Sequence, residues 1–185
     1  MSGAIALPRV TLEAVRTEIR AASWFAALGD ELTEGDLVDA RAYAEALAIG
    51  PLDIVLAHDW PEAERILKSP DASPLWWECE ESLRRALLAA AEQRYPERAL
   101  WTALTELTTE TGDLVHGKAA TAAARAGDAA KASIHVAAGA AAQAVYQLAV
   151  TRLSQADAPL FESKFRLFAA GRWPLGVTQG SLVVF

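Results

Sequence analysis

The sequence contains a single cysteine, Cys79, and no asparagine. One cysteine excludes an internal disulfide and a zinc site built from several thiolates, and a chain without asparagine has no acceptor for N-linked glycosylation. Cys79 stands between Glu78 and Glu80, and negative neighbours oppose the thiolate form that a reactive cysteine needs. We therefore expect Cys79 to have a structural role.

The common catalytic and nucleotide-binding motifs are also missing. The sequence has no Gly-x-Gly-x-x-Gly, no complete phosphate-binding loop ending in Gly-Lys-Ser or Gly-Lys-Thr, and no Gly-x-Ser-x-Gly nucleophile turn. With no motif of these kinds to assign, we predict no catalytic residue and no cofactor, and we do not expect an enzyme.

Positive charge is scarce relative to negative charge. The chain has 17 Lys and Arg against 24 Asp and Glu, which gives a formal net charge of −7 and a pI near 5.0. Nucleic-acid-binding domains carry the opposite excess, because Lys and Arg displace the counterions of phosphates. We therefore expect no nucleic-acid partner, and we expect attraction to a basic protein instead.

Long hydrophobic runs are absent as well. The most apolar stretch, residues 134–150, is shorter than the ~20 residues that a membrane-spanning helix needs. The first eight residues lack the charged start and apolar run of a signal peptide. These features predict a cytoplasmic protein with no membrane partner.

Alanine is abundant, with 41 residues among 185, and apolar residues recur at helical spacing along most of the chain. We predict an all-α fold, an antiparallel bundle of four or more long helices in a single domain, 1–185. Its expected parts are N-terminal helices in 1–70, a main bundle in 71–171 and an extended or hairpin tail in 172–185. Capping residues, prolines and glycines mark the ends of the expected helices, which are 11–28, 34–50, 60–68, 74–94, one from 96 onward, 129–155 and 159–171.

Three details of this pattern are specific enough to check. Residues 52–57 suggest a short apolar turn between two helices. Gly112 and Gly117 fall inside the helix that begins near Pro96, and each costs about 1 kcal/mol of helix propensity, so we expect a kink or break there. Asp128 is expected to cap the next helix.

Histidine is rare, and its placement suggests one alternative function. His116 follows Asp113 at helical spacing, with Glu110 one turn earlier, and His135 lies on the next predicted helix. If the two helices are neighbours, Glu110, Asp113, His116 and His135 form a candidate site for a divalent metal. A structural reading stays open, in which His116 interacts with a helix end and His135 lies in the core.

Tryptophan and glutamate concentrate in one part of the chain. The candidate binding residues are Trp60, Trp76, Trp77, Glu78, Glu80 and Glu81. Tryptophan is enriched among the residues that anchor protein interfaces, and indoles beside carboxylates suit Arg or Lys recognition. Two adjacent tryptophans on a helix point about 100° apart, so one of them should be at least partly exposed. Burial of both under residues 51–68 is the structural alternative.

Several residues of the C-terminal part form an ordered series of aromatic, acidic and apolar positions. The series is Trp77-Glu78-Cys79, then Glu81, Leu87, Glu92 and Tyr95-Pro96, followed by residues 124–129 and 135–138. In this order, residues 76–150 resemble the Ala-rich, all-α immunity proteins of bacterial polymorphic-toxin loci. The resemblance implies a non-enzymatic role in binding a partner protein, and it transfers no catalytic residue.

The sequence thus supports three functional hypotheses. The first is a protein-interaction module, immunity-like, that uses an acidic face containing tryptophan. The second is a metal-binding bundle protein or enzyme centred on His116 and His135. The third is a structural homo-oligomer in which the β-prone tail exchanges between copies.

Overall fold

The protein is mostly helical and also contains a small sheet. The computed structural model describes residues 8–126 and 131–185, and the predicted cap at Asp128 lies outside this part. The mainly helical expectation is confirmed, whereas the bundle of four or more long helices is not confirmed. The elements are α1 (Arg9–Ala21), α2 (Glu34–Leu47), β1 (Asp53–Leu56), α3 (Trp60–Leu67), α4 (Pro74–Arg94), α5 (Glu97–Arg125), α6 (Lys131–Ser154), α7 (Pro159–Ala169), β2 (Pro174–Thr178) and β3 (Ser181–Val184).

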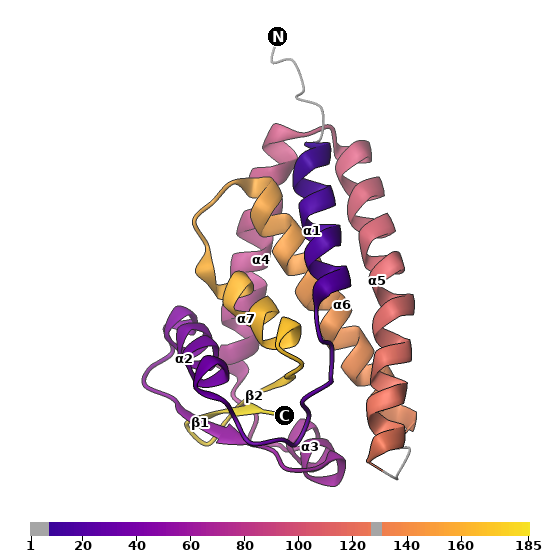
Figure 1. Ribbon diagram of the computed structural model, residues 1–185. Helices are drawn as coiled ribbons and strands as arrows, with labels where there is room; N and C mark the ends of the chain where they lie inside the picture. Colours follow the sequence, from indigo (N-terminus) through magenta and orange to yellow (C-terminus); the bar gives the residue numbers. More distant parts are fainter. Residues whose placement is uncertain (1–7, 127–130) are drawn as a thin grey trace.

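Helix α6 is the centre of the helical part. It contacts α5 most extensively and also packs against α4, α7 and α1 (Figure 1). Ala137, Ala141 and Ala144 of α6 are completely buried. Small side chains let neighbouring helices approach the α6 backbone closely, which accounts for the number of helices around it.

Helix α5 is continuous, so the predicted break at Gly112 or Gly117 is wrong. Both glycines leave open space where a side chain would be, and neither has a positive φ. The 29-residue helix is held along its length by packing, which outweighs a propensity cost of about 1 kcal/mol per glycine. Gly112, Gly117 and Lys118 have the spacing of part of a phosphate-binding loop, but Ala119 replaces the final Ser or Thr and the segment is helical.

Residues 52–57 form a strand where a turn was expected. Strand β1 pairs in parallel with β3, with Asp53 opposite Ser181 and Leu56 opposite Val184. Strands β2 and β3 form an antiparallel hairpin, so β3 lies in the middle of the sheet. A run of four residues carries little periodicity, and its partner strand is more than 120 positions away, so local sequence gave no indication of the pairing.

The C-terminal tail is part of the core of its own chain. Gln179 and Gly180 have φ values of +48° and +78°, as a tight hairpin turn requires. Backbone hydrogen bonds join Phe185 to Trp173 in both directions, and both side chains are almost completely buried. The tail therefore docks within the chain, as a hairpin.

An aromatic core fills the end of the molecule that contains the sheet. Trp60 is 3% exposed, and its ring packs edge-on against Phe185 with centroids 5.4 Å apart. Trp24, Phe25 and Phe168 continue the same cluster. Helix α1 ends at Ala21, earlier than expected, because the chain turns there to bury Trp24 and Phe25.

Arg172 fixes the loop between α1 and α2. Its buried guanidinium donates to the carbonyl oxygens of Ala27, Asp30 and Glu31 and to the carboxylate of Asp36. Asp36 also completes the capping box of α2 with Thr33. A buried cation is tolerated here because all these partners compensate its lost hydration.

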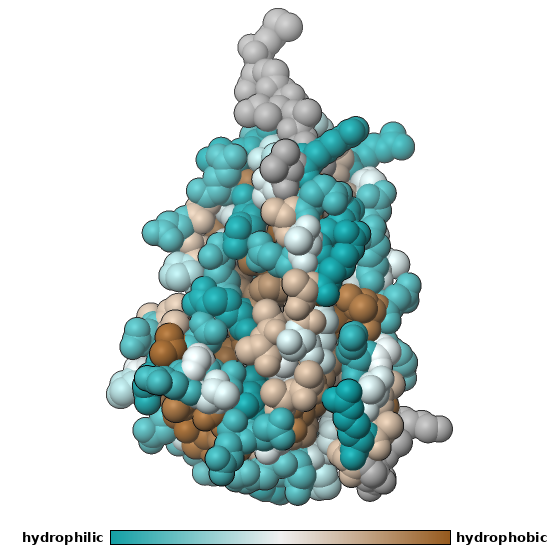
Figure 2. Space-filling model, viewed as in Figure 1, coloured by the Kyte–Doolittle hydropathy of each residue, from teal (hydrophilic) through white to brown (hydrophobic). Residues whose placement is uncertain are grey.

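The face of the molecule seen in Figure 2 is mainly polar. Figure 2 shows hydrophilic side chains over most of the viewed face, with smaller apolar areas between them. Among the residues described, no helix combines the length and the apolar character needed to cross a membrane.

Candidate functional site

The start of α4, the middle of α6, α7 and strand β2 enclose a pocket of about 290 Å³, called the Trp76 pocket below. One wall is formed by the Trp76 ring, which packs directly on Gly176 of β2. Gly176 has a φ of +138°, and a Cβ there would lie only 3.0 Å from the Trp76 ring, so both the backbone and the close approach favour glycine. Representative lining residues are Trp76, Trp77, Val136, Ala140, Lys164 and Leu175.

A buried ion pair lies beneath this pocket. Glu80 and Lys164 are 3% and 5% exposed, and the Lys164 Nζ donates to Glu80 Oε2 at 2.6 Å. Gln147 donates to the same oxygen at 3.3 Å, and the Tyr43 hydroxyl donates to Glu80 Oε1. Trp76 Nε1 in turn donates to the Tyr43 hydroxyl oxygen at 2.6 Å. Both carboxylate oxygens of Glu80 are therefore occupied.

Burial dominates the acid–base properties of this cluster. It lowers the pKa of Lys164, although the charge of Glu80 opposes the shift. Burial, followed by the nearby charge of Glu80, raises the pKa of Tyr43 well above its ordinary value. With Glu80 and Lys164 paired, the floor of the pocket has no net charge to offer a ligand.

The structure brings together three of the six predicted binding residues. Trp76, Trp77 and Glu80 line the Trp76 pocket, with Trp77 56% exposed at its edge. Glu78, which directly follows Trp77 on α4, is exposed. Trp60 lies in the aromatic core and offers no surface to a partner.

Glu81 is neutralised by two arginines. Arg84 donates to both of its oxygens at 2.7 Å, and Arg85 donates at 2.7 Å. These hydrogen bonds, those of Arg84 above all, lower the pKa of Glu81 to about 2. Of the three glutamates predicted to make this face acidic, only Glu78 has no ion-pair partner among the described residues.

Exposed apolar side chains surround the pocket. Among the described residues, six large hydrophobic side chains are more than 40% exposed, and two of them line the pocket. These two are Trp77 of α4 and Val136 of α6. Clustered exposed apolar groups are a mark of binding surfaces, whereas single ones are normal.

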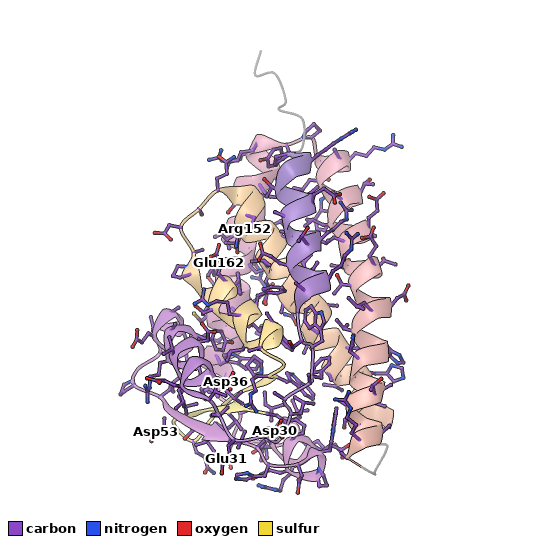
Figure 3. All side chains as sticks on the ribbon, in the orientation of Figure 1. Asp30, Glu31, Asp36, Asp53, Arg152 and Glu162 are labelled. Carbon is purple, nitrogen blue, oxygen red and sulfur yellow. The ribbon has the colours of Figure 1, made fainter. Side chains whose placement is uncertain are left out.

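The negative charge of the chain is concentrated beside this pocket, a feature that was not predicted from the sequence. Residues 30–78 hold twelve of the 24 acidic residues and three of the 17 basic ones, a formal charge of −9 against +2 for the rest. Figure 3 shows Asp30, Glu31 and Asp53 at the same end of the molecule, near β1 and α3. The exposed carboxylates of this segment that form no ion pair with a described residue, named the acidic end below, are Asp30, Glu31, Glu34, Glu45, Asp53, Asp59, Asp71 and Glu78.

The predicted metal ligands come together only in part. The rings of His116 and His135 are adjacent, with centroids 5.0 Å apart. Glu110 instead accepts a hydrogen bond from Arg16 of α1 at 3.1 Å, and Asp113 is exposed. In the described part of the chain, no group of three or more His, Cys, Asp or Glu side chains is placed to hold a metal ion.

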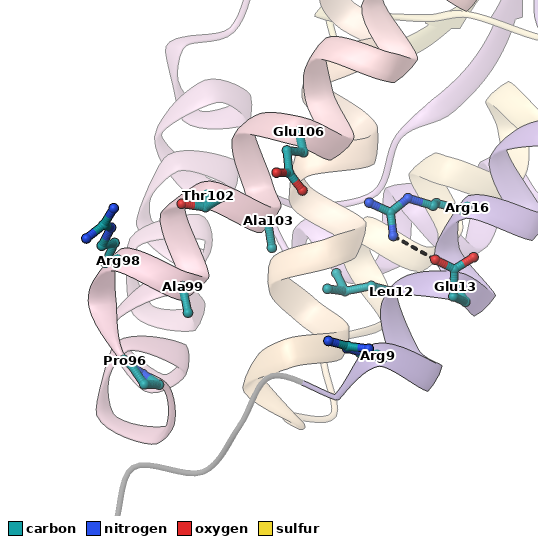
Figure 4. A pocket seen from close by; sticks show the side chains of 10 residues that line it. All are labelled: Arg9, Leu12, Glu13, Arg16, Pro96, Arg98, Ala99, Thr102, Ala103 and Glu106. Atoms are coloured by element: carbon teal, nitrogen blue, oxygen red, sulfur yellow. Dashed lines mark hydrogen bonds and ion pairs between the residues drawn. The ribbon is translucent and has the colours of Figure 1, made fainter.

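A larger groove, of about 1010 Å³, separates α1 from the beginning of α5 (Figure 4). Leu12 and Ala103 lie at its base, and charged side chains of both signs stand along its edges. Glu13 and Arg16 pair with each other at 2.9 Å on one wall. The charged residues that line it are of both signs, and no buried polar residue is among the lining residues that the structure describes, so no function is assigned to the groove.

No protein-family model, curated protein or solved structure matches this chain. The function is therefore proposed from the geometry and chemistry of its surface alone.

Proposed function

We propose that this protein is a non-enzymatic interaction module that binds a basic protein through the acidic end and the Trp76 pocket. The observation that carries the proposal is the position of the pocket. Its edge holds the exposed Trp77 and Val136, and it adjoins the segment that carries all of the chain's excess negative charge. An apolar centre with a charged periphery is the usual anatomy of a protein interface.

The pocket favours an apolar or aromatic anchor from the partner. Most of its lining is aliphatic or indole, and the Glu80 carboxylate already accepts from Lys164, Gln147 and Tyr43. A cation entering the pocket would lose its hydration without gaining a free carboxylate, which is costly. This differs from the expectation that the tryptophans and glutamates together hold an Arg or Lys side chain.

Basic side chains of the partner would contact the edge of the pocket. Glu78 follows Trp77 on α4, and Asp71 precedes Ala72, which lines the pocket. Attraction between opposite charges on the two partners, around an apolar anchor, accelerates association and fixes their orientation. Salt screens this attraction and weakens it. The affinity should therefore depend on both the anchor and the ionic strength.

Selection of peptides from a random displayed library against the immobilised full chain tests this proposal. We expect the selected sequences to combine Lys or Arg with one Trp, Phe, Leu or Met, and a synthetic peptide of the consensus provides the probe. Trp77→Ser should reduce its affinity by about tenfold or more, the scale of an interface hot spot. Asp71→Asn with Glu78→Gln should weaken binding mainly at low salt.

Trp101→Ser is the matched control, because Trp101 is an exposed tryptophan of α5, 41% exposed, outside the pocket. Glu97→Gln with Glu106→Gln is the matched charge control, since both residues are exposed on α5. If the controls and the pocket variants weaken binding equally, or if the selected peptides carry no basic residues, the proposal is wrong.

The immunity-like role implied by the resemblance of residues 76–150 is a narrower form of the same proposal. It requires that the basic partner be a toxin encoded beside this protein. Sequencing the neighbouring reading frames and measuring binding between the two purified products tests it.

A further inference from the structure

We propose that His116 and His135 form a two-histidine site for a divalent transition-metal ion on the surface where α5 meets α6. The site lies outside the Trp76 pocket, and its existence is independent of the proposed protein-binding function. Both imidazoles are exposed, and their ring centroids are 5.0 Å apart with planes inclined by 38°.

The separation matches bidentate coordination. Metal–nitrogen bonds of about 2.0–2.1 Å, extended by roughly 1.1 Å to each ring centre, place the centres about 5.2 Å apart at a tetrahedral angle and about 4.5 Å apart at a right angle. The observed 5.0 Å lies between these values. Because both side chains are exposed, their rings can turn toward a common point without disturbing the core.

The two histidines stand on helices that pack against each other. Val115, directly before His116 on α5, is completely buried, and Ile134, directly before His135 on α6, is buried as well. The contact between α5 and α6 is the most extensive between any two elements in the described structure. Because the packed helices hold both histidines on one surface, an ion bound by one imidazole meets the other at a high effective concentration, so two imidazoles are enough for measurable affinity.

The imidazole nitrogens of the site determine which class of metal ion it favours. Imidazole nitrogen suits Cu²⁺, Ni²⁺ and Zn²⁺, whereas Mg²⁺ and Ca²⁺ require oxygen ligands. No third His, Cys, Asp or Glu of the described chain joins the pair. The remaining coordination positions are therefore open to water or to a donor group from another molecule.

Titration of the full chain with CuCl₂, NiCl₂ or ZnCl₂ in a non-chelating buffer tests the site by calorimetry, and electron paramagnetic resonance of the Cu²⁺ form reports its nitrogen ligands. We expect one ion per chain, with affinity in the order Cu²⁺ above Ni²⁺ and Zn²⁺. His116→Ala and His135→Ala should each lower the affinity by about 100-fold or more, since each converts chelation into single-ligand binding. Zn²⁺ should also raise the unfolding temperature of the wild type and of neither variant.

His58→Ala and Cys79→Ser are the matched controls, because they remove the other histidine and the only thiol and should leave the affinity unchanged. Circular dichroism without metal should give the same spectrum for every variant. Binding that persists in the double variant of His116 and His135, or that is lost in only one of the two single variants, overturns the proposal. So does the absence of Cu²⁺ binding to the wild type.

Discussion

Replacing Lys164 by methionine gives a direct test of the buried ion pair under the Trp76 pocket. The substitution keeps most of the side-chain volume and removes the charge 2.6 Å from Glu80 Oε2. Glu80 then keeps only the neutral donors Tyr43 and Gln147, at a position that is 3% exposed. Breaking a buried pair in this way costs about 3–5 kcal/mol, because a buried charge loses its partner.

For a domain of this size, that loss lowers the unfolding temperature by about 6–20 °C, at roughly 2–4 °C per kcal/mol. Urea unfolding followed by circular dichroism measures it, with an unchanged slope showing that the same two states are compared. The double variant Glu80→Gln with Lys164→Met removes both charges, and we expect it to recover most of the lost stability.

Lys68→Met is the matched control, since Lys68 forms an exposed pair with Glu64 on α3, where the lysine side chain is 77% exposed. It should leave the unfolding temperature almost unchanged. A cost of less than about 1 kcal/mol for Lys164→Met, equal to that of a surface pair, would refute the conclusion that the floor of the pocket is a sealed, mutually neutralised pair. The inference that the pocket excludes cationic anchors would then be lost as well.

Three further predictions concern stability. Gly176→Ala should destabilise the protein by about 1–3 kcal/mol, because its Cβ would lie 3.0 Å from the Trp76 ring at a φ of +138°; chemical unfolding measures this. Gly117→Ala, in open space on α5, should instead raise stability by about 0.5–1 kcal/mol in the same assay, and a loss would contradict the continuous helix. The pKa of Glu81 lies near 2 in the folded protein, below its unfolded value. Its pairing with Arg84 and Arg85 therefore stabilises the fold above about pH 4.5, and this contribution is lost as the pH falls toward about 2. An acid titration of unfolding should show a smaller decline in this range for Glu81→Gln.

The helices were predictable where local chemistry decides them. The Thr33 and Asp36 capping box and the Asp59 cap both form as their sequences indicate. Pro74 and Pro159 stand in the first turns of α4 and α7, where their fixed φ and missing N–H cost nothing. Each of these signals depends on residues within a few positions of one another, so no tertiary knowledge is needed to read them.

The candidate site was predictable only in part. The adjacency of Trp76 and Trp77 on a helix already required that their side chains diverge, and Trp77 is the exposed one. The pairing of Glu80 with Lys164 joins residues 84 positions apart, and nothing near either residue indicates it. The concentration of acidic residues in 30–78 can be counted in the sequence, whereas its position beside the Trp76 pocket depends on tertiary packing.

The sequence by itself determined a mainly helical chain, the positions of most helix ends, the excess of negative charge and the absence of the common catalytic motifs. Only the tertiary structure decided that Asp53–Leu56 is a strand, that Trp60 is buried and that Glu80 is neutralised. It also decided that His116 and His135 meet. The physical reason is the range of the interactions: caps and periodicity act within one or two turns of a helix, whereas strand pairing, burial and charge pairing depend on which distant segments the compact chain brings together.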